Sequence, residues 1–340
     1  MGDDIELACN IARKWLPIIT SEDKNRVKEI MTGDEKTCGN ILLRKYVELL
    51  RPYAKIIGIS GGTNGPHEID CVASGIVFFY GCLIYIMHFP KWGEHIEDIF
   101  LYNLLYILVD HYIDDVNIDS NIKNKSISQM FILVNDPLMY KKLKLVDPVL
   151  KNIAKIYYRL ITRCPKCKES IIKLFEAEIE GLYVQKTNNM RREDYYNIAA
   201  KKGGYTMEVL RDIMGYDGDN GETYKLGKIM QLIDDMLDVI TDKTNGINTI
   251  ATYDLENIGN LDTLWINIMD CIDDIGDTFT IFKLLYVLVM VYVPDRNKGT
   301  YTDRLRCSTN ALNLFELNGS LMLVENIMNE LNVMEILEPM

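Results

Sequence analysis

The chain contains Gln231-Leu-Ile-Asp234-Asp235-Met-Leu-Asp238, and Asp110-His-Tyr-Ile-Asp114-Asp115 presents a similar pattern nearer the N-terminus. We call these stretches the downstream and the upstream aspartate motif. Each lies inside a long apolar run, where ionised carboxylates are costly unless they are paired or bind a metal. On a helix, carboxylates four residues apart project from one face about one turn apart. Two such faces directed at each other would supply the oxygen ligands that Mg²⁺ prefers, with room for a substrate phosphate.

The rest of the composition limits the class of protein. The chain has 340 residues, of which 48% are hydrophobic and 25% charged, as in an ordinary globular protein. Its net charge of −12 argues against nucleic acid or an anionic membrane surface as a partner. The N-terminus shows no signal peptide, and eight cysteines, mostly in apolar segments, indicate reduced thiols. We therefore expect a cytoplasmic protein.

The periodicity is helical throughout. Strand-type alternation is nowhere sustained, and there is neither an internal repeat nor a long linker, so we expect one all-α domain over residues 1–340. The apolar stretch 71–87 is nearly long enough to span a bilayer, but its glycines and cysteines favour a buried helix and no stable membrane insertion. Apolar residues recur at spacings of three and four in 5–18, 40–57, 68–88, 96–115, 147–163, 168–187, 192–214, 222–242, 262–274, 278–292 and 320–337.

Two further patterns, a third acidic cluster and a pair of cysteines, could also be read as metal-binding sites. Asp270, Asp273, Asp274 and Asp277 form a third acidic cluster, but the adjacent glycine suits a helix end, so we expect it to play no part in metal binding. Cys164-Pro-Lys-Cys167 has the spacing of a zinc or redox pair. No second such pair exists, and a surface turn between helices is the preferred interpretation.

Leu226 to Asp242, with Gly227 and Gln231 ahead of the aspartates, resembles the second aspartate-rich motif of all-trans isoprenyl diphosphate synthases. The upstream motif resembles their first, with His111 in place of the usual second aspartate. Gly181-Leu-Tyr-Val-Gln185, followed by Tyr195 to Gly204, resembles their glutamine-bearing helix and lysine-containing segment. The order and approximate spacing hold over residues 40–255.

The resemblance implies a class I terpenoid synthase fold, a helical bundle around a central apolar cavity. It further implies three Mg²⁺ ions that bridge the two motifs to an allylic diphosphate, and a homodimer. His111 would point about 100° away from Asp110 on a helix, so we expect it to pack beside the metals instead of binding one. The metal ligands would be Asp110, Asp114, Asp234, Asp235 and Asp238. The groups that contact substrate would be Lys202, or Lys201 in its place, with Gln231, Gln185 and Arg51, and the catalytic set would be Asp110, Asp114, Asp234 and Lys202.

The basic residues for a second substrate are largely missing. The family binds isopentenyl diphosphate with a Gly-Lys-Arg-x-Arg-Pro segment and an Arg-Arg pair after the first motif. Here the first reads Val47-Glu-Leu-Leu-Arg51-Pro52, and Lys123 and Lys125 are the only cations just after the upstream motif. Each charge-assisted hydrogen bond contributes about 1.5–3 kcal/mol, so losing three donors would weaken binding roughly a thousandfold or more. The pattern predicts ionisation of one allylic diphosphate without chain elongation.

Aromatic residues precede the upstream motif. Tyr102 and Tyr106 lie two turns and one turn before Asp110, so they should limit the depth of a cavity below the diphosphate and favour a C15 substrate. Aromatic faces stabilise cations by about 0.5–2 kcal/mol each, although each ring also fits an ordinary core. The others in this group are Phe78, Phe79, Tyr80, Tyr85 and Trp92.

Three hypotheses follow from these residues. The first is a Mg²⁺-dependent cyclase that converts farnesyl diphosphate to a cyclic sesquiterpene hydrocarbon or alcohol and pyrophosphate. The second is a trans-prenyltransferase making C15 or C20 diphosphates with a non-standard isopentenyl site. The third is a non-catalytic subunit of such a synthase, against which the retained aspartates argue. The first is preferred.

Overall fold

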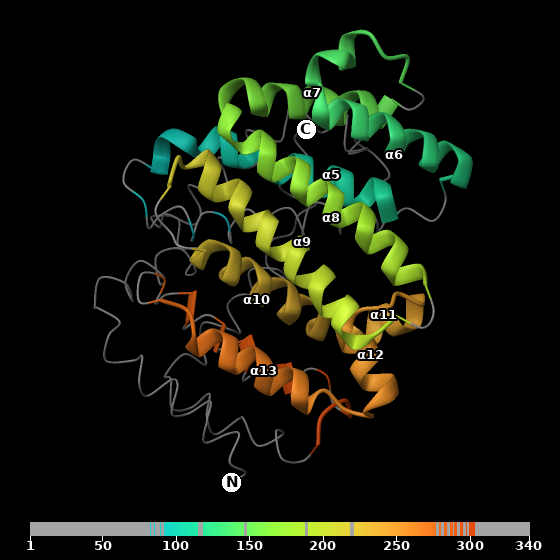
Figure 1. The fold of residues 1–340 in the computed structure, drawn as a ribbon, viewed down its shortest axis with the longest axis vertical. Coiled ribbons are helices and arrows are strands. Elements are labelled where there is room, and N and C mark those ends of the chain that lie inside the picture. The colour runs from blue at the N-terminus through green and yellow to red at the C-terminus, as the bar shows by residue number, and fades with distance from the viewer. Residues whose placement is uncertain are drawn as a thin grey trace, which may run out of the picture. The chain divides into compact units, whose positions relative to one another are not determined.

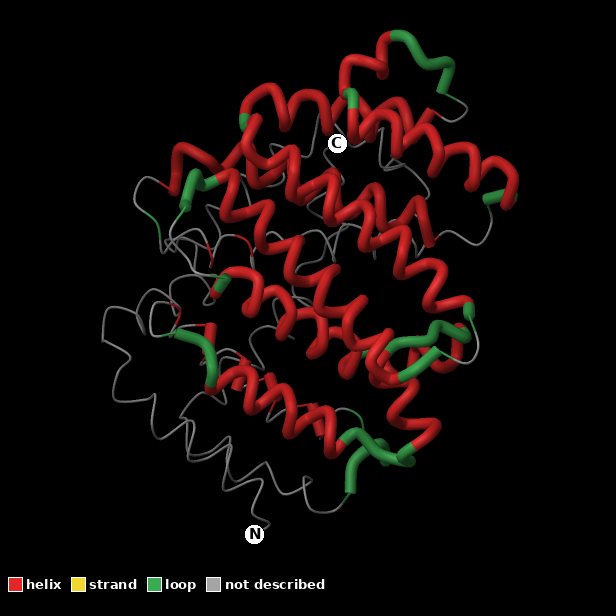
Figure 2. The backbone as a smooth tube through the Cα atoms, viewed as in Figure 1, coloured by secondary structure: helices red, strands yellow, loops and turns green. Residues whose placement is uncertain are grey.

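The computed structural model of the chain describes residues 92–114, 118–145, 148–187, 190–217 and 221–276, with isolated positions between 82 and 89 and between 279 and 302. Within these residues all regular structure is helical and none is a β-strand (Figure 2). The all-α prediction is thus confirmed for the part of the chain that the structure describes. Contacts divide the chain into two compact units, which we describe separately. Of the described residues, the upstream unit holds 82–172 and 212–216, and the downstream unit holds 173–211 and 217–302.

The upstream unit is organised around α5 (Ile96–Asp114), which follows the short 3₁₀ helix η2 (Trp92–His95). Helix α7 (Pro148–Arg163) packs against both α5 and α6 (Ser120–Asn135), as Figure 1 shows. A second 3₁₀ helix, η3 (Pro137–Lys141), contacts α6 and α7. Nearly every side chain between Asp98 and Leu108 is buried, as expected of an interior helix that is apolar on all faces.

The downstream unit is organised around α10 (Glu222–Leu237), which packs against α11 (Val239–Asn245), α12 (Ile250–Asn257) and α13 (Asp262–Asp273) (Figure 1). Buried Leu226, Ile229, Ile233 and Met236 recur at spacings of three and four along α10 and form its core face. The unit also includes α8 (Lys168–Lys186) from residue 173 and α9 (Arg192–Ile213) up to residue 211.

One ion pair joins α9 to α12. Arg192, at the start of α9, donates from Nε and from a terminal nitrogen to the two carboxylate oxygens of Asp254, at 2.7 and 2.8 Å. Asp254 is fully buried, so removal of its partner would leave an uncompensated charge in the interior.

Two glycines let α9 and α10 approach backbone to backbone. A methyl group placed on Gly203 would overlap the carbonyl oxygen of Gly227, and one placed on Gly227 would overlap the carbonyl oxygen of Gly203. The same methyl on Gly203 would lie 2.7 Å from Cβ of Gln231. Because no side chain fits between the two backbones, this crossing sets how the residues on either side of it face each other.

The periodicity predicted most helices to within a few residues but missed two. Helix α6 was missed because its first half is rich in Asn, Ser and Lys; its N-cap Asp119 accepts hydrogen bonds from the next backbone N–H groups. Helix α12 was missed because it is short, although Thr249 and Thr252 form a capping box at its start. The helix expected over 222–242 is interrupted at Asp238, where α10 ends and α11 begins.

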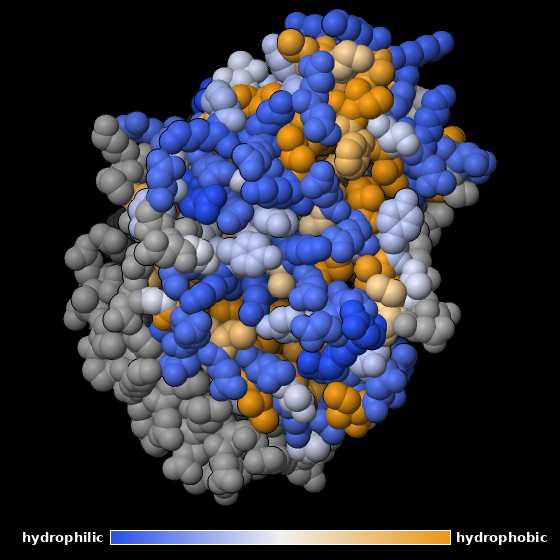
Figure 3. All heavy atoms as spheres, in the orientation of Figure 1, coloured by the Kyte–Doolittle hydropathy of each residue, from blue (hydrophilic) through white to orange (hydrophobic). Residues whose placement is uncertain are grey.

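Hydrophilic side chains cover much of the visible face of the described residues, with smaller hydrophobic groups between them (Figure 3). Within the described ranges, no helix combines the length and the apolar character that crossing a bilayer requires. Of the apolar stretch 71–87, only Cys82 and Tyr85 lie inside the described residues, and both are buried. The single domain over residues 1–340 stays a prediction.

Replacing Gly227 by alanine should destabilise the protein, because the new methyl group meets backbone atoms of Gly203 that cannot move independently. Overpacking of this kind costs about 1–3 kcal/mol in the free energy of unfolding. Denaturant unfolding followed by circular dichroism measures the change. Gly93→Ala is the control, since nothing lies within 4 Å of a methyl group at that position. Equal unfolding midpoints for the two variants would contradict the close crossing.

Candidate functional site

The polar cluster of the downstream unit includes an ion pair between a partly buried lysine and a buried glutamate. Lys202 of α9 donates from Nζ to Oε2 of Glu178 on α8 at 2.8 Å. Glu178 is only 9% exposed, and its other oxygen, Oε1, is buried without a hydrogen-bond partner among the described residues. A buried carboxylate oxygen without a donor is costly, so this side of Glu178 is suited to receive one.

The glycine crossing brings the downstream aspartate motif to the same place. Gln231 of α10 lies beside Gly203, the neighbour of Lys202. Its side-chain nitrogen Nε2 donates to Oδ2 of Asp234 at 3.3 Å and to Oδ1 of Asp235 at 3.2 Å. Lys202 is near enough to act electrostatically on both aspartates. The structure therefore brings together four predicted residues from two helices: Lys202, Gln231, Asp234 and Asp235.

The two aspartates are held in a surrounding that disfavours their charge. Burial, and then repulsion from Asp234, raises the pKa of Asp235 to about 8, against the opposing effects of Gln231 and Lys202. Loss of hydration, followed by repulsion from Asp238, raises the pKa of Asp234 to about 6. Asp235 carries the clearer effect, because it is 8% exposed, whereas Asp234 is exposed to solvent, which weakens the rise in its pKa. Adjacent carboxylates that repel each other are a donor set suited to a hard cation.

The described residues supply only part of the ligand set of a metal ion. Among the described residues, no group of three or more His, Cys, Asp or Glu side chains is arranged to hold a metal. Mg²⁺ does not need such a cage, because it commonly binds one or two carboxylates and takes its remaining ligands from water and substrate phosphate. Asp234 and Asp235 meet that smaller requirement.

The remaining downstream predictions are less central. Lys201 pairs at 2.7 Å with Glu180 on a more exposed part of the surface, so it is directed to a different partner from Lys202. Asp238 caps the end of α10 and is exposed. Gln185 lies near the end of α8, but its side chain is outside the described part of the structure.

The upstream predictions belong to the upstream unit. Helix α5 continues through Asp114, so Asp110 and Asp114 lie one turn apart in its last turns, although their side chains are not among those described. Tyr102 is fully buried and Tyr106 partly exposed, with ring centroids 6.4 Å apart. Arg51 and Phe78 lie outside the described residues.

The described part of the third acidic cluster, Asp270 to Asp274, lies at a helix end, as expected, and Asp277 lies outside the described residues. Helix α13 ends at Asp273, and the next residue, Asp274, caps it. The carboxylate of Asp274 pairs with Lys225 at 2.9 Å while remaining largely exposed. An exposed carboxylate that is hydrated and already paired with a cation would gain little stabilisation from binding a metal ion.

Glu178 is the residue of this cluster that sequence patterns missed. A signal was present, because Glu178 precedes Gln185 by seven residues and thus shares its face of the helix. Its pairing with Lys202 could not be read from the sequence, since nothing local specifies which turn of α9 meets which turn of α8.

Comparison with known proteins adds no assignment: no protein-family model matches this chain, and no curated protein is significantly similar to it.

The substitution Asp235→Asn should stabilise the metal-free protein at high pH. Because the folded-state pKa of Asp235 lies above its ordinary value, the folded state retains full stability below about pH 4 and loses some as pH rises through about 8. An asparagine side chain cannot ionise, so that loss disappears in the variant. We expect a melting temperature several degrees above wild type at pH 8.5 and close to it at pH 5.

Asp270→Asn provides the matched control, because Asp270 lies exposed on α13. Its melting temperature relative to wild type should not change with pH. If the Asp235→Asn difference were equally flat between pH 5 and 8.5, Asp235 would not be held in the neutral form.

Proposed function

We propose that this protein is a metal-dependent terpene synthase with a class I terpenoid synthase helical bundle around an apolar cavity. Its reaction is ionisation of an allylic diphosphate, farnesyl diphosphate in the first instance, to give a cyclic sesquiterpene hydrocarbon or alcohol and pyrophosphate. The observation that carries the proposal is the convergence of Lys202, Gln231, Asp234 and Asp235 beside the Gly203–Gly227 crossing. A cation, an amide and two carboxyl groups with raised pKa values are suited to bind a diphosphate together with its metal ions.

The residues of this cluster divide the work. Lys202 supplies a positive charge for the diphosphate oxygens, and Glu178 holds its ammonium group in position. Gln231 fixes the orientation of Asp234 and Asp235, which would ligate metal together with Asp238. When bound, Mg²⁺ would neutralise the charge that develops on the departing pyrophosphate. Lys202 is the preferred ligand of the substrate because it is near enough to act on Asp234 and Asp235, whereas Lys201 pairs with Glu180 on a more exposed part of the surface.

The proposal gives Asp110 and Asp114 of the upstream motif the same task of metal binding, with three Mg²⁺ ions in all, as the family resemblance implies. It also includes a homodimer in the cytoplasm. Cyclisation is preferred to elongation because the sequence retains few of the basic residues that would hold isopentenyl diphosphate. The trans-prenyltransferase is the second candidate, since the aspartate-rich form of the downstream motif, with Gln231 ahead of it, is the form that prenyltransferases use.

Incubation of the purified protein with Mg²⁺ and C10, C15 or C20 allylic diphosphates, with and without isopentenyl diphosphate, separates the candidates. We expect cyclic volatile products from the C15 substrate alone, detected by gas chromatography with mass spectrometry. Longer diphosphates that form only when isopentenyl diphosphate is present would establish the prenyltransferase instead. Absence of both products and of pyrophosphate release would refute both enzymes.

Asp234→Asn should abolish pyrophosphate release, because it removes a metal ligand at which leaving-group charge develops. We expect a loss of at least about a hundredfold in kcat/KM, measured with a coupled pyrophosphate assay. Asp273→Asn, at the exposed end of α13, should retain nearly wild-type activity. The metal roles would be wrong if Asp234→Asn kept activity within about tenfold of wild type, or if Asp273→Asn were the inactive variant.

Lys202→Met and Lys201→Met form a matched pair of neighbouring substitutions. Loss of a charged hydrogen bond to the diphosphate costs about 1.5–3 kcal/mol, so Lys202→Met should lower kcat/KM by about tenfold to a hundredfold. Lys201→Met should change it by less than about fivefold, because an exposed ion pair such as Lys201–Glu180 contributes at most about 1 kcal/mol. The reverse order of effects would reassign the diphosphate contact to Lys201.

A further inference from the structure

The two cysteines of Cys164-Pro-Lys-Cys167 lie at a turn between helices, as the sequence predicted. Pro165 to Cys167 form the 3₁₀ helix η4, which connects α7 to α8. Cys167 is fully buried, whereas Cys164 is partly exposed. The thiol of Cys167 donates to the backbone oxygen of Cys164 at 3.0 Å. One thiol of the pair can therefore meet a reagent from solvent, and the other cannot.

The turn brings the two residues within reach of each other. The backbone N–H of Cys167 donates to the carbonyl oxygen of Cys164 at 3.3 Å, which closes a four-residue turn. The first and fourth Cα atoms of such a turn lie within about 7 Å, and disulfides span about 4.4–6.8 Å between Cα atoms. A bond between the two sulfurs is thus compatible with the backbone as it stands.

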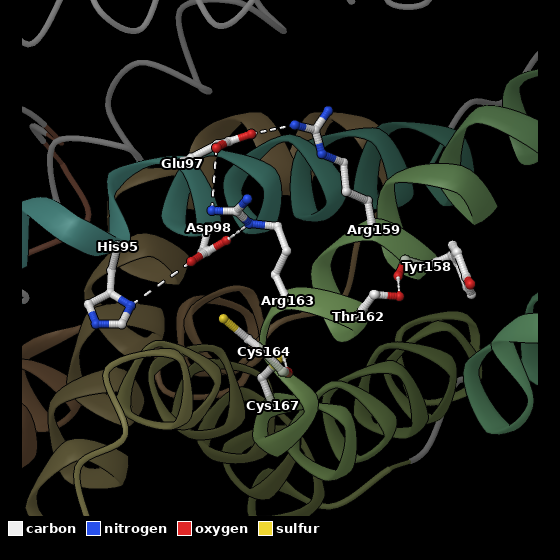
Figure 4. Close-up of polar contacts among 9 residues, drawn as sticks. All are labelled: His95, Glu97, Asp98, Tyr158, Arg159, Thr162, Arg163, Cys164 and Cys167. Carbon is white, nitrogen blue, oxygen red and sulfur yellow. Dashed lines mark hydrogen bonds and ion pairs between the residues drawn. The ribbon is translucent and has the colours of Figure 1, made fainter.

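Charged groups of the upstream unit surround the partly exposed thiol. The buried carboxylate of Asp98 accepts a hydrogen bond from Nε of Arg163, and Nδ1 of His95 lies 3.9 Å from its other oxygen. Figure 4 shows Cys164 next to this Asp98–Arg163 pair, with Cys167 behind it. Glu97, on the same helix as Asp98, pairs with Arg159 and Arg163.

This surrounding disfavours a thiolate but not a disulfide. Burial, and then the negative charge of Asp98, raises the pKa of Cys164 to about 12. Burial, followed by the effect of Cys164, raises the pKa of Cys167 to about 12 as well. A disulfide carries no charge, so it escapes both penalties. The surrounding stabilises no thiolate, and the hydrogen bond that oxidation would remove, from the Cys167 thiol to the Cys164 carbonyl oxygen, is of the weak kind that thiols form.

We propose that Cys164 and Cys167 form a reversible dithiol–disulfide centre that exchanges electrons with small-molecule disulfides. The Cys164 thiol loses its proton to solvent, and its sulfur attacks the external disulfide, breaking the S–S bond and releasing one thiolate, which takes up a proton from solvent. Cys167 then loses its own proton and attacks the Cys164 sulfur of the mixed disulfide, releasing the second thiolate, which is protonated in turn. One external disulfide becomes two thiols, and the protein loses two electrons and two protons. This centre is independent of the proposed diphosphate chemistry.

The test equilibrates the full-length protein in buffers of reduced and oxidised glutathione, then traps free thiols with an alkylating reagent. Peptide mass mapping should show the peptide containing Cys164 and Cys167 lighter by two hydrogen atoms and protected from alkylation. Reduction with dithiothreitol should restore both thiols. Cys271, which has no cysteine partner at this spacing, is the internal control and should remain open to alkylation throughout.

Two variants test the order of the steps. In Cys167→Ala the mixed disulfide cannot be resolved, so Cys164 should retain one glutathione. In Cys164→Ala the buried Cys167 should stay a thiol. The centre is overturned if both wild-type thiols remain free in the most oxidising buffer, if either pairs with another cysteine, or if glutathione reaches Cys167 first. Stoichiometric zinc in the purified protein, released by a chelator together with exposure of both thiols, would also overturn it.

Discussion

The backbone contact between Gly203 and Gly227 is the constraint on which the proposed site depends. It fixes which turn of α9 faces which turn of α10, and it sets Lys202 near Gln231 and the aspartates that follow. A larger residue at either position would separate the helices, and the cation would no longer reach the carboxylates. Packing therefore determines the electrostatics here, because the polar groups converge only if nothing stands between the two backbones.

The cluster that results is poorly satisfied by the protein alone. Asp234 raises the pKa of Asp235, Asp238 raises that of Asp234, and one oxygen of Glu178 lacks a donor among the described residues. Ionising several carboxyl groups this close together is unfavourable for folding, and a bound cation would offset that cost. The same imbalance would attract a diphosphate only in the company of metal ions, since the polyanion alone would be repelled.

Sequence periodicity predicted much of the described fold because interior helices carry their pattern locally. Helices α7 and α13 begin and end within a residue of the expected bounds, since their apolar positions repeat without interruption. Helix α6 was not predicted, because the apolar residues of its polar first half are too few to show helical periodicity. Within the site, the grouping of Gln231 with Asp234 and Asp235 follows from helical spacing. The Glu178–Lys202 pair and the glycine crossing do not, because both join residues of different helices whose register only the folded chain defines.

The oxygen of Glu178 that has no hydrogen-bond partner among the described residues has a practical consequence. A protein with a buried acceptor that lacks a donor is less stable without ligand than the same fold in which that acceptor is hydrogen-bonded. This is the usual compromise between stability and function. Any ligand that supplies the missing donor or cation binds the folded state alone and raises the melting temperature by mass action. The rise in melting temperature could therefore rank candidate metals and diphosphates before any product is known. The ligand that raises it most at a given concentration would be the best candidate for the natural one.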